Sequence, residues 1–515
     1  MHFTRFTPRH SFRAAHGLIL LAALAGWACE DQDTAGPVTA TPANAVAEQL
    51  LQGLPGHATF STYLGGNGQD QVRDVALDAA GNMYVVGGTM SANFPTTAGA
   101  FDRSFNGSYD IFVAKFSPTG QLLFSTFLGG PAYDRAYAVE LDPSGNIIIG
   151  GRTGGGLPGT AGKFNPTFKG GKVVGLYGQQ DGFVCKLNPT ASAVIFCGYI
   201  GTLDEHITRD VAVDPSGNIY ATYLADQSGI SASWTTGGYK STFPGSSSNL
   251  IVKIAPDGSR ILGGTWFGGS GEEGGNPSVR WFNGKVYFAG HTASADLPTP
   301  GGFDHTRGGA WDDFLAVFTD NLQSLVFATY VGGSNVEDVE THNLAIDAAG
   351  NAFLAANSAS TDLPGTTGKF QKTNQGGYDG FVMKISPTGA LLASSYYGGI
   401  LGDQFQGVAV DNTGRVFLST ISQSLLLPTT AGTLGLLKNG SAGLVVMSPN
   451  LDSLLFAEFL GGSQSDEARN IAVGAGGTVV VGGMTQSSNW YLASAYQAGF
   501  GGGTMDGILM RFTGF

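Results

Sequence analysis

Seven residues able to bind a cation or to exchange a proton recur at one fixed place in the chain. Each stands five residues after the first glycine of a short aromatic–aliphatic–Gly motif, whose first copy is Tyr63-Leu64-Gly65-Gly66. The seven residues are Asp70, Asp134, His206, Glu273, Glu337, Asp403 and Asp466. Carboxylate oxygens are the ligands that Ca²⁺ prefers, and paired carboxyl groups serve as acid and base in glycoside hydrolysis. The spacing therefore predicts a ring of acids, and we next consider the elements that would position it.

The period of the motif indicates a repeat protein. Its first glycines stand at 65, 129, 201, 268, 332, 398 and 461. A fixed period of this length indicates one supersecondary unit that must pack on its neighbours to bury its faces.

Each unit is predicted to contain four β-strands. Short runs rich in Val, Ile, Phe and Tyr are bounded by Gly, Pro, Asn and Asp, and no long segment has a helical period. In the first unit the runs are Val72–Leu77, Met83–Gly87, Ile111–Phe116 and Leu122–Leu128. Asp78–Asn82 and Ser117–Gly120 form the tight turns, in which glycine supplies a positive φ. Seven such units predict a single all-β domain, a seven-bladed β-propeller with four antiparallel strands per blade.

The ends of this domain predict how the ring closes. Residues 506–512 form a third strand with no fourth, and residues 58–64 form a fourth strand with no partners before it. Pairing them would remove an exposed sheet edge. The predicted blades span about 71–130, 135–202, 207–269, 274–333, 338–399, 404–462 and 467–515 with 58–64.

Four motifs of the first unit resemble a known family. They are Ser-Thr-Tyr-Leu-Gly-Gly from residue 61, Val-Ala-Leu-Asp-x-x-Gly-Asn-x-Tyr-Val from 75, Thr-x-Ser-x-x-Phe-Pro-x-Thr from 89 and Asp-x-Phe-Val-Ala-Lys from 110. They resemble the SBBP type of bacterial β-propeller repeat, and the resemblance extends over residues 58–515. It implies an exported or surface-attached propeller, and it implies no reaction.

The first 57 residues are predicted to be a leader and a tether. Residues 1–28 combine three arginines with a short apolar run, which is typical of an export signal. Cys29 follows Ala28 and resembles the lipidated cysteine of a bacterial lipoprotein; ordinary cleavage after Ala28 is the alternative. Residues 29–57 have the composition of a flexible tether. These features predict an envelope or cell-surface protein whose membrane contact is a lipid on Cys29.

Composition narrows the classes of partner. The net charge is −13 and only 13% of residues are charged. Phosphate-backbone binding needs a basic face, so a nucleic-acid partner is not expected. The long segments after the second strand of each unit should share one face with the Gly-Gly crossovers, and loops on a rigid scaffold commonly carry binding. We expect a monomer that binds a protein or a glycan through this long-loop face.

Two interpretations of the acidic ring stay open. In the structural one, each carboxylate accepts hydrogen bonds from the backbone and ties neighbouring blades together. In the functional one, several carboxylates hold Ca²⁺ at the mouth of the central channel. The paired marks on the third strands (Asp110 with Lys115, and likewise Asp181 with Lys186, Asp379 with Lys384 and Asp506 with Arg511) are interpreted as structural.

A polysaccharide-active enzyme is the alternative function. It would need two ring carboxyls about 5 to 9.5 Å apart. It would also need aromatic side chains such as Trp234, Trp311 or Trp490 gathered around them. No cofactor and no nucleophile motif is indicated.

Cysteine and histidine raise two further questions. Cys185 and Cys197 fall on adjoining strands of the second unit, so they predict either a cross-strand disulfide or two buried thiols. His206, His291, His305 and His342 fall in units three to five, where lone histidines are usually solvated and a metal or acid–base cluster is the alternative.

Overall fold

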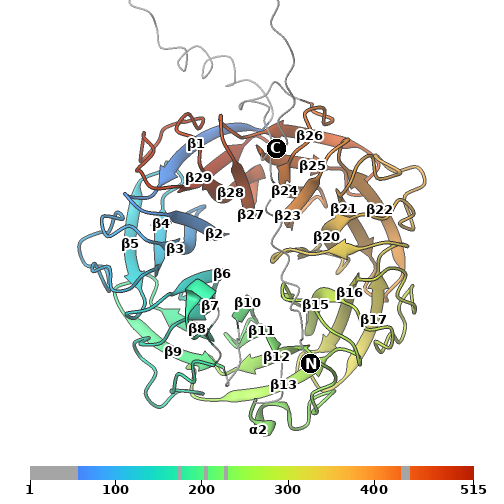
Figure 1. The fold of residues 1–515 in the computed structure, drawn as a ribbon, viewed down its shortest axis with the longest axis horizontal. Coiled ribbons are helices and arrows are strands. Elements are labelled where there is room, and N and C mark those ends of the chain that lie inside the picture. The colour runs from blue at the N-terminus through green and yellow to red at the C-terminus, as the bar shows by residue number, and fades with distance from the viewer. Residues whose placement is uncertain (1–55, 172, 174, 202–206, 226–229, 431–440) are drawn as a thin grey trace, which may run out of the picture. The chain divides into compact units, whose positions relative to one another are not determined.

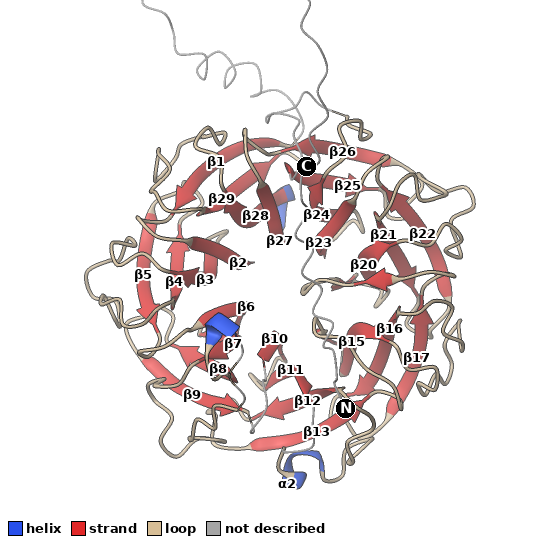
Figure 2. Ribbon diagram, viewed as in Figure 1, coloured by secondary structure: helices blue, strands red, loops and turns tan. Residues whose placement is uncertain are grey.

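Seven antiparallel β-sheets stand around a central axis (Figures 1 and 2). The computed structural model describes residues 56–171, 173, 175–201, 207–225, 230–430 and 441–515. Six sheets contain four strands each, and the first strand of the remaining sheet is split into two pieces. The predicted seven-bladed propeller is confirmed.

The strands follow one another within each blade from the axis outward, as Figure 1 shows. Blades one and two comprise β2 (Asp70–Leu77), β3 (Met83–Thr89), β4 (Asp110–Phe116), β5 (Leu122–Leu128), β6 (Arg135–Leu141), β7 (Ile147–Thr153), β8 (Asp181–Leu187) and β9 (Val194–Ile200). Blades three and four comprise β10 (Ile207–Val213), β11 (Ile219–Ala225), β12 (Ser248–Ile254), β13 (Ile261–Phe267), β14 (Ser278–Phe282), β15 (Lys285–Thr292), β16 (Asp312–Thr319) and β17 (Leu325–Val331).

Blades five and six comprise β18 (Glu337–Asp338), β19 (Leu344–Ile346), β20 (Ala352–Ser358), β21 (Asp379–Ile385), β22 (Leu391–Tyr397), β23 (Asp403–Val410), β24 (Val416–Ser422), β25 (Ser441–Met447) and β26 (Leu454–Phe459). Blade seven comprises β27 (Asp466–Gly474), β28 (Thr478–Thr485), β29 (Asp506–Thr513) and, as its outer strand, β1 (His57–Leu64). The described helical segments are the short helix α2 (Ala232–Thr235) and the 3₁₀ turns Gly175–Tyr177 and Ala475–Gly477. None of the helices in this described part is long and apolar enough to cross a membrane.

Closure of the ring joins the two ends of the domain. Strand β1 pairs antiparallel with β29, with Tyr63 opposite Ile508 and Leu64 opposite Gly507. The buried Tyr63 hydroxyl donates to the Ser487 carbonyl at 2.8 Å and accepts from the Trp490 amide at 2.9 Å. The predicted closure is therefore confirmed, and it fills what would otherwise be an open edge of blade seven.

The core lies between the blades as well as within them. One cluster joins Val86 and Val113 of blade one to Ile149 and Phe183 of blade two, all of them fully buried. Another joins Phe60 of β1 to Val85 of blade one across the closure. Each sheet thus buries both faces against its neighbours, as a repeat unit that cannot fold alone requires.

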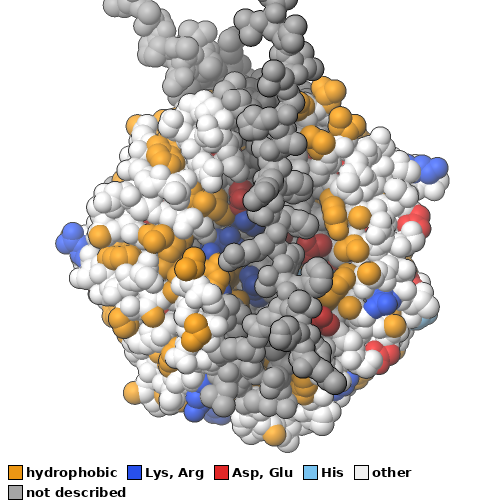
Figure 3. Space-filling view, in the orientation of Figure 1, with side chains coloured by type: hydrophobic (Ala, Val, Ile, Leu, Met, Phe, Trp, Pro, Cys, Tyr) orange, Lys and Arg blue, Asp and Glu red, His pale blue; other side chains and the backbone are white. Residues whose placement is uncertain are grey.

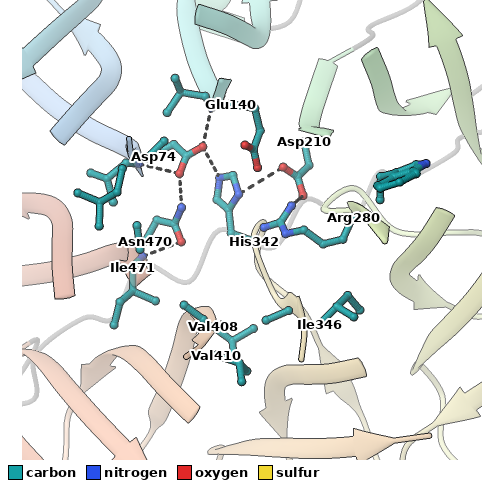
Figure 4. A pocket seen from close by; sticks show the side chains of 18 of the residues that line it. Asp74, Glu140, Asp210, Arg280, His342, Ile346, Val408, Val410, Asn470 and Ile471 are labelled. Carbon is teal, nitrogen blue, oxygen red and sulfur yellow. Dashed lines mark hydrogen bonds and ion pairs between the residues drawn. The ribbon is translucent and has the colours of Figure 1, made fainter. Parts of the chain in front are cut away.

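A β-bulge in the inner strand turns side chains toward the axis. In blade one the register shifts between Val72 and Asp74, opposite Gly87. A Cβ added to Gly87 would lie 1.8 Å from the Gln71 carbonyl oxygen, so only glycine fits there. Bulges re-aim side chains, and Asp74 reaches the central channel in this way (Figure 4).

Candidate functional site

The repeated acids hold the Gly-Gly crossovers between blades. The Asp70 carboxylate accepts a hydrogen bond from the Gly66 amide at 2.8 Å, one from the Ser91 hydroxyl at 2.7 Å and a third from the Thr89 hydroxyl. Asp70 is fully buried. The carboxylate thereby links the crossover to the end of the second strand of its own blade.

The same arrangement recurs around the ring. In each case the second glycine of the motif donates its amide, and hydroxyls from the second strand or the residues after it donate as well. The acids are Asp134, Glu273, Glu337, Asp403 and Asp466. All five are buried. Burial raises the pKa of Asp134 to about 6, although hydrogen bonds from Thr153 and Gly130 oppose the shift. His206 lies outside the described residues. This geometry supports the structural interpretation, because the carboxylates lie beneath the crossovers instead of exposed at the channel mouth.

A cation on these acids would have to displace their hydrogen-bond donors. Ca²⁺ needs six to eight oxygen ligands around one point. Across the described ranges, no group of three or more His, Cys, Asp or Glu side chains is arranged to hold a metal ion. Calcium binding by the ring therefore stays a prediction. Binding would cost the free energy of the hydrogen bonds that the cation displaces.

A second set of buried acids anchors the long loops. The Asp110 carboxylate accepts the Asn106 amide at 2.7 Å, and its equivalents Asp181, Asp312, Asp379 and Asp506 accept loop amides in the same way. The strand-three lysines do not pair with these acids: Lys115 lies 3.2 Å from Asp78 of the tight turn, and Lys186 lies 2.7 Å from Asp142. Residues five apart on a strand point to opposite faces and lie toward opposite ends of the blade, so the acid and the lysine of each third strand have separate structural roles.

The two cysteines of blade two form a disulfide. Cys185 of β8 lies opposite Cys197 of β9, with Cα atoms 4.1 Å apart and a bond between the sulfurs. Of the two alternatives that the sequence left open, the structure has the cross-strand disulfide.

Blade five departs from the repeat at the axis. Asp347 stands ten residues after Glu337, whereas Asp78 stands eight residues after Asp70. The inner strand is therefore broken into β18 and β19, and the residues between them leave the sheet. His342 occupies this insertion with a φ of +70°, a conformation that most residues avoid.

The imidazole of His342 crosses the channel to the opposite blades. Its Nε2 lies 2.8 Å from the Tyr137 carbonyl oxygen of blade two and 3.8 Å from Asp74 of blade one, and its Nδ1 lies 3.5 Å from Asp210 of blade three (Figure 4). The His342 amide donates to the Ser278 hydroxyl at 3.0 Å. One residue of blade five thus contacts four other blades. The expectation of a solvated histidine is wrong for His342, which is almost fully buried.

Charge surrounds His342 on both sides. Burial lowers its pKa, but the Asp74 and Asp210 carboxylates outweigh burial and raise it above the ordinary value. Asp210 also accepts from the Arg280 guanidinium at 2.6 Å. The two carboxylates therefore favour the protonated imidazole, although Arg280 opposes them.

The His342 insertion separates two unlike halves of the channel. Toward the tight-turn face lies a cavity of about 330 Å³, lined by Asp74, Glu140, Asp210, Arg280 and the ends of the inner strands. Burial raises the pKa of Glu140 to about 7, although Arg280 opposes the shift. Toward the long-loop face, the first four residues of the inner strands β2, β6, β10 and β27 include Arg73, Tyr137, Arg209 and Arg469. In Figure 3, Lys and Arg side chains lie on one side of the central opening and Asp and Glu side chains on the other.

The tryptophans do not gather around two ring acids. Trp490 is buried in blade seven, where its Nε1 donates to the Ser61 hydroxyl at 3.0 Å. Trp234 packs against the core of blade three, and Trp311 lies 5.1 Å from the His291 ring. In the part of the chain that the structure covers, this scatter does not favour the polysaccharide-active alternative.

Comparison with known protein families finds a β-propeller repeat in this chain. The family model described as the SBBP beta-propeller repeat matches residues 59–95. No curated protein matched the chain. Among solved structures, BamB from Moraxella catarrhalis is similar with 12% identity and a TM-score of 0.35, covering 89% of this chain and 99% of that one.

Two further solved structures are similar at the same level. A protein of unknown function from Dyadobacter fermentans has 9% identity and a TM-score of 0.42, with 89% and 99% of the two chains covered. A europium-containing methanol dehydrogenase has 12% identity and a TM-score of 0.40, with 90% and 94% covered. The assignment itself rests on the seven sheets and the matched repeat: the chain is a seven-bladed β-propeller that carries an SBBP-type repeat.

Proposed function

We propose that this propeller is an exported, non-catalytic binding protein that docks a protein partner on its long-loop face. The supporting observation is an apolar groove between blades five and six. Ile400 is 73% exposed and Leu426 is 82% exposed. They line an opening of about 500 Å³ with Phe370, Leu427 and Pro428.

The chemistry of this groove favours a protein over a glycan. Large aliphatic side chains left in water on a folded domain commonly mark interfaces with other proteins. Glycan sites instead depend on polar groups and aromatic faces. In this groove Phe370 is the one aromatic side chain, and Gln371 and Gln375 are the polar ones. A glycan partner is the second candidate, and the test below includes it.

A paired substitution tests the docking groove. Ile400→Asp with Leu426→Asp places two charges where we expect the partner to bury apolar surface. Leu392→Asp is the matched control, because Leu392 is 48% exposed on outer strand β22, away from the groove. Quantitative pull-downs from envelope extract should recover a protein with the wild type and with the control and lose it with the groove variant.

Two results would reject this proposal. One is the same set of captured proteins for all three forms. The other is a glycan-array signal that the groove substitutions abolish, with no protein lost, which would assign the groove to the glycan alternative.

Export and lipid anchoring form part of the same proposal. Residues 1–28 have signal composition, and Cys29 stands where a lipidated residue is expected. Both lie outside the described residues. Mass spectrometry of the mature N-terminus should find a diacylglyceryl cysteine at position 29, and an unmodified N-terminus would instead support ordinary cleavage after Ala28.

A further inference from the structure

Four arginines from three adjacent blades surround one tyrosine at the long-loop mouth of the channel. The guanidinium carbons of Arg73, Arg135, Arg152 and Arg209 lie 5.2, 4.7, 5.7 and 4.8 Å from the ring centre of Tyr137. Arg73 comes from β2, Arg135 from β6, Arg152 from β7 and Arg209 from β10. Like charges at this spacing repel one another unless an anion lies between them.

Three of the channel's carboxylates pair with other arginines. Arg280 pairs with Asp210 at 2.6 Å, and Arg469 pairs with Glu340 at 3.7 Å and with Glu467. Among the described residues, no carboxylate is ion-paired with Arg73, Arg135 or Arg209. The net charge of the chain is −13, so overall composition does not explain this cluster of arginines.

Donors in this cluster also lack acceptors. The Nε–H groups of Arg135 and Arg209 are buried and donate to no acceptor. The buried hydroxyl of Tyr109, whose ring stacks on Tyr133 at 4.7 Å, also has no hydrogen-bond partner. A buried donor without an acceptor costs free energy that a bound oxyanion would recover. The guanidinium fork matches the oxygens of phosphate, sulfate and carboxylate groups.

Electrostatics within the cluster favour an added anion. Burial and the neighbouring Arg469 and Arg135 lower the pKa of Arg73. Burial raises the pKa of Tyr137, but Arg135, Arg152, Arg209 and Arg73 outweigh it and lower that pKa to about 7. Above that pH the Tyr137 phenolate is an internal counter-charge to the arginines, and an added anion would compete with it.

The cluster is open on one side and closed on the other. Arg73, Arg135 and Arg209 are each partly exposed. The space between Arg73 and the residues of blades five to seven that face it is only about 10 Å³, roughly enough for one water molecule; it is lined by Arg73, Tyr137, Glu340, Thr341, His342, Gln406 and Arg469. A ligand would therefore bind at the mouth and could not pass through the channel.

We propose that Arg73, Arg135, Arg152 and Arg209 form a binding site for a small oxyanion that carries at least two negative charges. Its chemistry is that of a phosphate, a sulfate or a polycarboxylate. The site lies on blades one to three, apart from the apolar groove of blades five and six, and does not depend on a protein partner there.

Calorimetric titration with sulfate, inorganic phosphate and citrate tests this proposal at constant ionic strength. We expect saturable binding of all three, at least tenfold tighter than binding of acetate. A preference for citrate over both inorganic ions would assign the site to polycarboxylates, and the reverse order would assign it to phosphate or sulfate groups.

Substitutions locate the binding. Arg135→Gln with Arg209→Gln should weaken sulfate binding at least tenfold, and the milder Arg73→Lys should weaken it about threefold while keeping the charge. Arg260→Gln is the matched control, because Arg260 is exposed outside the channel. Circular dichroism and the melting temperature confirm that each variant is folded.

A pH profile supplies a second readout. Sulfate stays a dianion between pH 6 and 9, whereas the Tyr137 phenolate forms as the pH rises through about 7 and competes for the same arginines. Sulfate affinity should therefore fall at least threefold over this range, and Tyr137→Phe should flatten most of the profile. Burial lowers the pKa of Arg73 to about 9, so this arginine adds to the fall only at the upper end of the range.

Three results would overturn the proposal. The first is no saturable binding of any of the three anions. The second is equal binding by the wild type and by folded Arg135→Gln/Arg209→Gln protein. The third is a wild-type affinity for sulfate that does not change with pH.

Discussion

The repeated acids and the channel residues are both polar and both buried, yet they differ in what surrounds them. Asp70 and its equivalents have their hydrogen bonds satisfied within one blade and its crossover. His342, Asp74 and Tyr137 interact across the axis with residues from other blades. Residues that recur in every blade build the scaffold, whereas residues found once gather at the centre. Positions that break the repeat are therefore the better guide to function.

The largest expected effect is on closure of the ring. Deleting residues 58–64 removes the outer strand of blade seven and exposes the edge of β29. We expect loss of cooperative unfolding, or a melting temperature lower by more than about 10 °C, because the intact ring depends on every blade interface. The control is a truncation that removes residues 1–56 and keeps β1. An unchanged melting temperature for the 58–64 deletion would refute closure by β1.

Removal of one repeated acid should cost less but still a great deal. Asp70→Ala leaves the Gly66 amide and two hydroxyls buried without an acceptor, which should cost about 3 kcal/mol of unfolding free energy. Glu340→Gln alters a partly exposed channel ion pair and should cost less than about 1 kcal/mol. Denaturant titration measures the unfolding free energy of both variants. Equal losses would contradict the contrast between the scaffold acids and the channel residues.

EDTA gives a direct check of the same acids. We expect the melting temperature of the wild type to be unchanged by EDTA, since protein donors already occupy the ring carboxylates. A drop on chelation that added Ca²⁺ reverses would restore the cation-ring interpretation.

The disulfide of blade two has no counterpart at the equivalent positions of blade one. Blade one carries Ala114 and Ser125 at the equivalent paired positions. The double variant Cys185→Ala/Cys197→Ser should therefore keep the fold. It should lose about 2 kcal/mol of unfolding free energy because the cross-link is absent. Reductant should lower the melting temperature of the wild type and leave that of the variant unchanged. A wild type indifferent to reductant would show that the bond adds no stability.

The smallest effect concerns the histidine at the axis and depends on pH. Because Asp74 and Asp210 raise the pKa of His342 in the fold, its stabilisation is complete below the unfolded value and is lost as the pH rises through the folded value. His342→Gln should therefore lower the melting temperature more at pH 6 than at pH 9. An equal loss at both pH values would mean that His342 acts by packing alone.

Local sequence carried enough information for the blades. Asp78-Ala-Ala-Gly-Asn82 predicts its own turn because Gly81 has the positive φ that the turn needs, and strands such as β4 and β5 end within two residues of their predicted bounds. The ring acids were found from spacing, and their structural role was one of the two interpretations offered. Asp110 and its equivalents were predicted to be structural, but the sequence did not show that they anchor loops. It also did not show that Lys115 pairs with Asp78 of the tight turn.

The residues that meet in the central channel were not predicted, although one local signal existed. The two extra residues between Glu337 and Asp347 mark blade five as irregular. An insertion shows that a strand is interrupted, but it does not show where the displaced side chain goes. Arg73, Arg135 and Arg209 look like ordinary single charges when each is considered in its own repeat.

The amino-acid sequence by itself determined the number of blades, their strands and turns, and the pairing of the domain's two ends, because hydrophobic alternation and turn chemistry act over a few residues. Only the tertiary structure decided what meets at the axis. His342 and the Tyr137 carbonyl are 205 residues apart in the chain, and closing the ring is what brings one inner strand from every blade to the same centre.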